Sequence, residues 1–85
     1  MQIADALRLA IQHLNAGRTA EAAAVCARIL EIQPANPVAN ALAARAARRS
    51  GDPARARRHV DAALAVAPDY LPARNLDAQL AADHE

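Results

Sequence analysis

The sequence of 85 residues has no phenylalanine, no tryptophan and no lysine, and Tyr70 is its only aromatic residue. Without aromatic side chains the chain lacks the stacking platforms that single-stranded nucleic-acid binders use. One cysteine cannot form an internal disulfide, which excludes the disulfide-stapled secreted domains and favours a reducing compartment. The longest apolar runs, residues 22–27 and 62–67, are far shorter than the roughly 20 residues that span a bilayer, and the first residues do not have the pattern of a secretory signal. We therefore expect a cytoplasmic protein that does not bind membranes.

Alanine and helix-forming residues dominate what is present. Alanine supplies 26 residues and apolar types reach 54%, while the net charge is only +1, which excludes an intrinsically disordered chain. Leucine, arginine and glutamate also favour helices, and the residues typical of strands are sparse. Apolar residues recur at helical spacing, as in Ile3, Leu7, Ala10 and Leu14. Composition and periodicity together predict an all-α domain.

Glycine, proline and short polar residues divide the chain into segments of similar length. Gly17 and Gly51 are the only glycines, and each follows a helical pattern. Asn36-Pro37 and Asp52-Pro53 each combine a capping side chain with a proline suited to the first helical turn, and Thr19 and Asp69 are also predicted to cap helices. These signals predict five helices, at residues 3–15, 19–32, 37–49, 53–66 and 71–83.

The chain also repeats itself with a period of 34 residues. A shift by this length superimposes Gly17 on Gly51, Ala22 on Ala56, Leu30 on Leu64 and Pro34 on Pro68. A regular period of this kind is typical of a helix–turn–helix unit that stacks on its own copy, so that each unit buries the face the other leaves open.

The repeat resembles the tetratricopeptide repeat family, whose period is also 34. The match rests on Gly17-Arg18-Thr19-Ala20-Glu21-Ala22, Cys26, Ile29-Leu30-Glu31-Ile32 and Pro34, and again on Gly51-Asp52-Pro53-Ala54-Arg55-Ala56, Val60, Ala63-Leu64, Val66 and Pro68. The resemblance implies a right-handed α-solenoid of antiparallel helix pairs in a single domain over residues 1–85. Repeat one spans 3–36, repeat two spans 37–70, and 71–83 forms a capping helix. The first helix of each repeat departs from the family pattern, since its large aromatic and small positions hold Ala6, Ala10 and His13, then Asn40, Ala44 and Ala47.

No constellation of residues points to catalysis. His13 and Cys26 fall on the two helices of one hairpin, where a histidine-activated thiolate is conceivable. The equivalent positions one repeat later are Ala47 and Val60, however, which favours a simple packing pair and an inert thiol. The three histidines are dispersed without metal-ligand spacing, and both glycines are used in turns rather than in a phosphate loop. We expect no enzyme activity, no catalytic or metal site, and no cofactor.

The near-neutral total charge conceals a polarised chain. Residues 1–36 balance at zero, residues 37–68 carry +4, and residues 69–85 carry −3. Arg45, Arg48 and Arg49 share one helical face, whereas Arg55 and Arg58 lie on another helix. Two separate basic faces disfavour duplex DNA as a partner. They leave two alternatives, a site for acidic peptides or a solvated surface with the local ion pairs Arg48–Asp52, Arg57–Asp61 and Arg58–Asp61.

In the family, the first helix of each repeat lines a concave groove. The resemblance therefore implies a peptide-binding groove with an apolar end and a basic, amide-lined end, formed by Leu7, Ile11, Leu14, Ala41, Arg45, Arg48, Asn75 and Gln79. A peptide with an apolar anchor and an acidic or carboxylate group complements such a groove. Some members grip a chaperone's C-terminal carboxylate with lysine, asparagine and arginine, but here those positions hold Leu7, Ile11, Leu42, Pro72 and Leu76, so that partner is disfavoured.

These observations predict a non-enzymatic protein–protein interaction module or adaptor. One alternative is a self-associating helical homodimer, because two repeats form little core on their own and the first helix is apolar on more than one face. Another is a segment of a larger protein, since bacterial tetratricopeptide segments of similar composition are often fused to transferase or regulatory domains.

Overall fold

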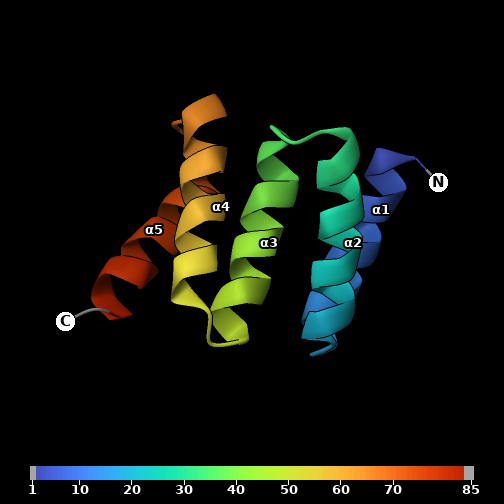
Figure 1. Ribbon diagram of the computed structural model, residues 1–85, viewed down its shortest axis with the longest axis horizontal. Helices are drawn as coiled ribbons and strands as arrows, with labels where there is room; N and C mark the ends of the chain where they lie inside the picture. Colours follow the sequence, from blue (N-terminus) through green and yellow to red (C-terminus); the bar gives the residue numbers. More distant parts are fainter. Residues whose placement is uncertain (1, 84–85) are drawn as a thin grey trace.

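The computed structural model describes residues 2–83 and consists, over those residues, of five helices and no strand. The helices are α1 (Ile3–Asn15), α2 (Thr19–Ile32), α3 (Pro37–Arg49), α4 (Pro53–Val66) and α5 (Leu71–Asp83). Their bounds coincide with the ranges predicted from the breaker residues. The helices follow one another in an antiparallel row, with α1 and α5 at opposite ends of the molecule (Figure 1). The all-α helical repeat predicted from the sequence is confirmed.

The turns within the two repeats are built identically. Gly17 and Gly51 have φ values of +79° and +80°, which only glycine adopts without strain. In the first turn the amides of Gly17 and Arg18 donate to the carbonyls of Leu14 and His13. Thirty-four residues later, the amides of Gly51 and Asp52 donate in the same way to the carbonyls of Arg48 and Ala47. The sequence repeat is therefore also a repeat of backbone hydrogen bonds.

The helix caps follow the predictions only in part. The Asn36 side chain accepts a hydrogen bond from the Ala39 amide at 2.9 Å, and the Asp52 side chain accepts one from the Arg55 amide at 3.0 Å. Thr19, by contrast, is the first residue of α2, where Arg18 holds the capping position without a side-chain hydrogen bond. The Thr19 prediction is wrong because the glycine turn places the capping position one residue earlier, as it does at Asp52.

Asp69 does not cap α5 either. The helix begins at Leu71, and the Arg74 amide donates to the carbonyl of Tyr70, the residue that corresponds to Asn36 in the repeat register. The Asp69 side chain is fully exposed and lies 3.9 Å from the Arg74 guanidinium. The Asp69 prediction therefore places the cap one residue too early.

The core consists of two clusters that meet at α3. One contains Ala10, Leu14, Ala22, Cys26, Leu42, Ala43 and Ala46, from α1, α2 and the near face of α3. The other contains Ala41, Ala44, Ala47, Ala56, Val60, Ala63, Ala73, Leu76 and Leu80, from the far face of α3 and from α4 and α5. The repeat-equivalent pairs Ala10 and Ala44, and Ala22 and Ala56, are all completely buried. The abundance of alanine thus reflects helices that pack closely on both sides of α3.

A polar contact occupies one of the positions where the family favours an aromatic side chain. Asn40 is 97% buried, and its amide nitrogen donates to the carbonyls of Pro34 and Asn36 at 3.1 and 3.2 Å. Its amide oxygen lies 3.0 Å from Nδ1 of His59 on α4. Because the amide nitrogen is the donor to both carbonyls, the oxygen accepts and Nδ1 of His59 carries the proton. This network ties the start of α3 to α4.

Candidate functional site

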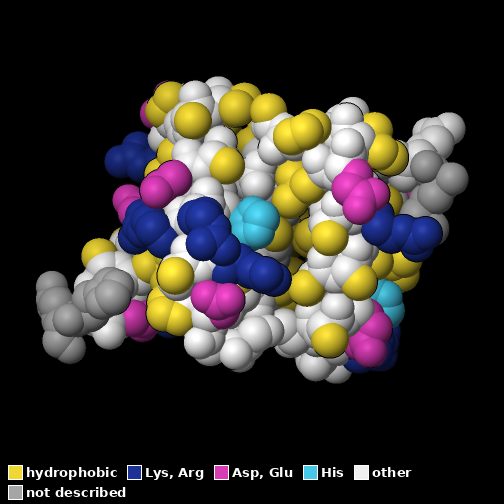
Figure 2. Space-filling model, in the orientation of Figure 1, with side chains coloured by type: hydrophobic (Ala, Val, Ile, Leu, Met, Phe, Trp, Pro, Cys, Tyr) yellow, Lys and Arg dark blue, Asp and Glu magenta, His cyan; other side chains and the backbone are white. Residues whose placement is uncertain are grey.

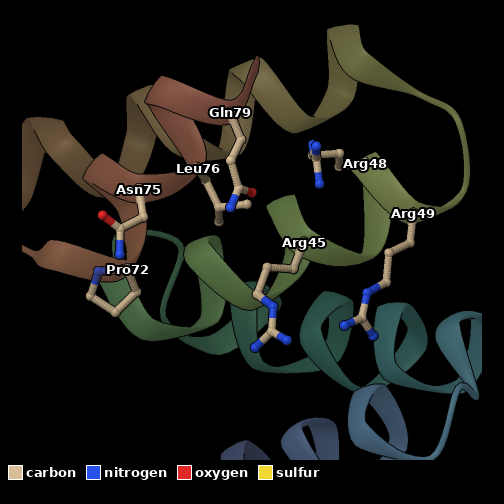
Figure 3. Close-up of a pocket in the computed structure, with 7 residues that line it drawn as sticks. All are labelled: Arg45, Arg48, Arg49, Pro72, Asn75, Leu76 and Gln79. Atoms are coloured by element: carbon tan, nitrogen blue, oxygen red, sulfur yellow. The ribbon is translucent and has the colours of Figure 1, made fainter. Parts of the chain in front are cut away.

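A pocket with a volume of about 420 Å³ lies between α3 and α5. Both are the first helices of their repeat units in the 34-residue register. Figure 3 shows the lining side chains: α3 contributes arginines, and α5 contributes two amides and two apolar residues. The full lining is Arg45, Arg48, Arg49, Pro72, Asn75, Leu76 and Gln79.

The structure brings together the basic, amide-lined half of the predicted groove. Arg45 and Arg48 face the pocket from α3, and Asn75 and Gln79 face it from α5, one helical turn apart. The sequence-based groove omits three further lining residues, Arg49, Pro72 and Leu76. Arg49 shares a helical face with Arg45 and Arg48, as their spacing predicts, and it lines the pocket together with them.

The apolar half of the predicted groove lies elsewhere. Leu14 and Ala41 are 1% and 2% exposed and belong to the two core clusters. Leu7 is half-buried against the first cluster, while Ile11 is 37% exposed on α1. None of these four residues lines the pocket between α3 and α5. Leu14 points into the core, where it belongs to the same cluster as Cys26 and Ala46.

Two of the three pocket arginines are already engaged within the chain. Arg48 donates from Nε and a terminal nitrogen to the Asp83 carboxylate, at 2.9 and 3.2 Å. The hydrogen bonds to Asp83, together with the attraction of its charge, raise the pKa of Arg48. Arg49 donates to the backbone carbonyl of Leu14 at 2.7 Å and so caps the end of α1. The Arg48–Asp83 pair is exposed to solvent, where water and salt weaken the attraction between the two charges.

Arg45 differs from its two neighbours, because it has no ion pair or hydrogen bond within residues 2–83. The Arg45 side chain is half-buried and lines the pocket. The side-chain amides of Asn75 and Gln79 also make no hydrogen bond to the described part of the chain. The pocket therefore presents one uncompensated guanidinium and two amides that can each donate and accept.

The ion pairs of Arg57 lie outside the residues that line the pocket. Arg57 on α4 bonds to Asp61 at 3.4 Å, as predicted, and also to Asp77 on α5. The predicted pairs Arg48–Asp52 and Arg58–Asp61 do not form. Asp52, which caps α4, instead lies 3.8 Å from Arg55, and Arg48 pairs with Asp83 of α5. Asp61 pairs with Arg57 rather than with Arg58.

A smaller hollow of about 140 Å³ lies between α2 and α4, over α3. Alanines line its floor, and Asp52, Arg55 and His59 line its α4 side. Figure 2 shows this face, with basic side chains gathered over α4 around a histidine ring. Burial, followed by the nearby charges of Arg55 and Arg58, lowers the pKa of His59, which is therefore neutral at pH 7.

Cys26 and His13 do not form a catalytic pair. Cys26 is completely buried, and this burial raises the pKa of its thiol to about 11. Nδ1 of His13 instead accepts a hydrogen bond from Nε of Arg18 at 2.9 Å. Within residues 2–83, no three histidine, cysteine or acidic side chains are grouped so that they could hold a metal ion. The thiol therefore lacks the basic neighbour and the access to solvent that a nucleophile needs.

Comparison with known families agrees with this architecture. The family model described as "Tetratricopeptide repeat" matches residues 13–80. The chain belongs to the tetratricopeptide repeat family, whose repeats generally mediate protein–protein interactions and are generally non-enzymatic. No curated protein and no solved structure matches it. In the part of the chain that the structure describes, no helix is both long and apolar enough to cross a membrane.

Proposed function

We propose that the protein is a non-enzymatic adaptor that binds a segment of another protein in the pocket between α3 and α5. The observation that carries this proposal is the half-buried Arg45, which lacks an ionic partner in the described chain and faces a pocket of about 420 Å³. A guanidinium binds a carboxylate through two parallel hydrogen bonds, and this geometry favours an acidic side chain or a terminal carboxylate.

The rest of the lining defines what accompanies that carboxylate. Asn75 and Gln79 can each donate to a peptide carbonyl and accept from a peptide amide, so they suit an extended backbone. Pro72 and Leu76 add an apolar wall beside them. The favoured ligand is therefore a peptide segment with a carboxylate next to an apolar side chain, as the resemblance implied.

The alternative role of the arginines, a merely solvated surface with local ion pairs, fits Arg57 and Arg55 better than Arg45. Arg57 and Arg55 have acidic neighbours within 4.0 Å, on their own helix or turn. Arg45 has none, and it lines the pocket, where a ligand carboxylate can reach it. Arg45 thus differs from Arg55 and Arg57 in combining the lack of an acidic neighbour with a place in the pocket lining.

The test is a binding titration by fluorescence anisotropy. The probe is a labelled peptide with a leucine anchor and a run of glutamates, measured beside the same peptide with glutamines. Arg45→Glu should weaken binding of the acidic peptide about tenfold or more, since a hydrogen bond to a charged group contributes about 1.5–3 kcal/mol. Arg58→Glu is the matched control, because Arg58 lies on α4, away from the pocket, and has no ion-pair partner in residues 2–83. Equal affinity for the two peptides, or equal losses in the two variants, would contradict the proposal.

A second variant tests whether Asp83 competes with the ligand. Asp83 occupies the two nitrogens of Arg48 that an acidic ligand would use. Asp83→Asn should leave Arg48 available and tighten binding of the glutamate peptide severalfold, with no gain for the glutamine peptide. A weaker affinity for the glutamate peptide would show that the pair builds the pocket rather than competing with the ligand.

A further inference from the structure

A third hollow lies at the N-terminal end of the molecule, away from the peptide pocket. Its volume is about 250 Å³, and apolar side chains of both helices of the first hairpin line it: Ile3, Ala6 and Leu9 from α1 and Val25, Ile29 and Ile32 from α2. Arg28 completes the lining. Ile32 is 73% exposed, although it is one of the largest apolar side chains in the chain. We call the surface around this hollow the α1–α2 edge.

In the second repeat, the surface equivalent to the α1–α2 edge is covered by a helix. In the 34-residue register, Ala6 and Leu9 of α1 correspond to Asn40 and Ala43 of α3. Asn40 and Ala43 are buried, and Ala43 belongs to the cluster in which α3 packs against α2. No helix of the described chain covers Ala6 and Leu9 in the same way. The α1–α2 edge is therefore a helix-packing surface without its helix, and Leu9 enlarges its apolar area where Ala43 stands in the covered repeat.

Three charged side chains of α2, at or near this edge, have no ion-pair partner within residues 2–83. All six aspartates, which lie within the described residues, have an arginine within 4.0 Å. Glu21, Arg28 and Glu31 of α2, by contrast, have no such partner in residues 2–83. Glu21 and Arg28 are two helical turns apart, with Val25 between them, so the polar and apolar groups form one outward stripe.

We propose that the α1–α2 edge binds the same edge of a second copy of this chain, in a two-fold symmetric dimer. Such a contact is self-complementary, because bringing Arg28 of one copy next to a glutamate of the partner copy's α2 also makes the reciprocal pair. In this dimer the arginine of each α2 pairs with a glutamate of the other copy's α2. The contact also covers Ile32 and the hollow beside it. Residues 1–36 carry no net charge, whereas residues 37–68 carry +4, so this edge brings two copies together without the repulsion that the arginine-rich middle would cause. The peptide pocket faces elsewhere, so the dimer and the proposed peptide binding are independent.

The first test is the molar mass of the 85-residue chain by sedimentation equilibrium, from about 1 to about 100 µM. We expect a dimer that dissociates on dilution, with a Kd near the micromolar range. Ile32→Asp should give a monomer at every concentration, since it places a charge in the apolar contact. Val66→Asp is the matched control, because Val66 occupies the same repeat position on α4, is also largely exposed and lies outside the hollow. A native chain that stays monomeric, or an Ile32→Asp variant that remains dimeric, would overturn the proposal.

A charge exchange then tests the pairing itself. Arg28→Glu makes the charged stripe of α2 entirely acidic, while the double variant Glu21→Arg with Glu31→Arg makes it entirely basic. Each variant should be monomeric alone because its two edges repel, and an equimolar mixture should form a heterodimer, visible by native mass spectrometry. All three substitutions are on exposed side chains, so the fold should persist, and circular dichroism checks this. A mixture that shows no heterodimer, or single variants that still form homodimers, would refute the edge-to-edge contact. Arg45→Glu should leave the dimer unchanged, which distinguishes this contact from one in the peptide groove.

Discussion

Replacing Leu14 by alanine tests whether this side chain belongs to the core or to the peptide groove. Leu14 is 1% exposed and is among the largest fully buried side chains of the molecule. Shortening it to alanine removes about 2.4 kcal/mol of apolar transfer free energy, at ~0.8 kcal/mol for each buried carbon, and leaves a cavity beside Cys26 and Ala46. Buried leucines of this kind cost about 2–5 kcal/mol when they are replaced by alanine. At about 0.05–0.15 kcal/mol per residue, the whole domain has only roughly 4–13 kcal/mol of stability to lose.

Urea denaturation followed by circular dichroism at 25 °C measures this loss, and a thermal scan should show Tm falling by at least about 8 °C. Ile11→Ala is the matched control, since Ile11 lies on the same helix but is 37% exposed, and it should cost less than about 1 kcal/mol. The hydrogen bond from Arg49 to the Leu14 carbonyl involves the backbone and should survive the substitution. If Leu14→Ala destabilised the protein no more than Ile11→Ala but weakened peptide binding, Leu14 would belong to the groove and the packing argument would be wrong.

Three further predictions concern a turn, the thiol and a histidine. Gly51→Ala should cost about 1–2 kcal/mol in urea denaturation because its φ is +80°, although no atom crowds the added methyl group; a neutral effect would contradict the backbone argument. Cys26 should react with a disulfide reagent at pH 7.5 only as fast as the chain unfolds, since burial raises the pKa of its thiol to about 11; rapid labelling of the native protein would contradict this. Stability should fall as the pH decreases below 6.5, because the pKa of His59 is lowered in the folded state and the unfolded chain therefore binds the proton more readily. His59→Gln should remove that part of the pH dependence, whereas His13→Gln should retain it, and equal urea midpoints for the native chain at pH 7.5 and 5.5 would refute the assignment.

The helix bounds were predictable because residues with strong local preferences set them. Gly17 and Gly51 adopt a backbone conformation that other residues avoid, and prolines at the first turn of α3 and α4 fix where those helices begin. The period of 34 then placed the buried alanines at equivalent positions of the two repeats. Local chemistry and repetition therefore determined the fold without knowledge of any tertiary contact.

The site was less predictable, because its character depends on which long side chains meet across helices. The spacing of Arg48 and Asp52 suggested a local pair, but the arginine reaches Asp83, 35 residues away on α5. Similarly, Asn40 appeared only as a departure from the family pattern, and its contact with His59 depends on the crossing of α3 and α4. Neither contact follows from periodicity, since a flexible side chain can choose among several partners at similar distance.

The repeat register also explains why Arg45 is the pocket arginine left without a partner within residues 2–83. The end of α3 contacts α1 where Arg49 donates to the Leu14 carbonyl, and the end of α5 contacts α3 where Asp83 accepts from Arg48. These two contacts are the same position pair shifted by 34 residues, so each first helix is tied at its C-terminal end to the first helix before it. These two contacts engage Arg48 and Arg49, the two arginines nearest the end of α3. Arg45 lies one turn earlier and lines the pocket between α3 and α5, and no side chain of the described α5 reaches it with a carboxylate. The contacts that hold the repeats together therefore also determine where a ligand's charge can be bound.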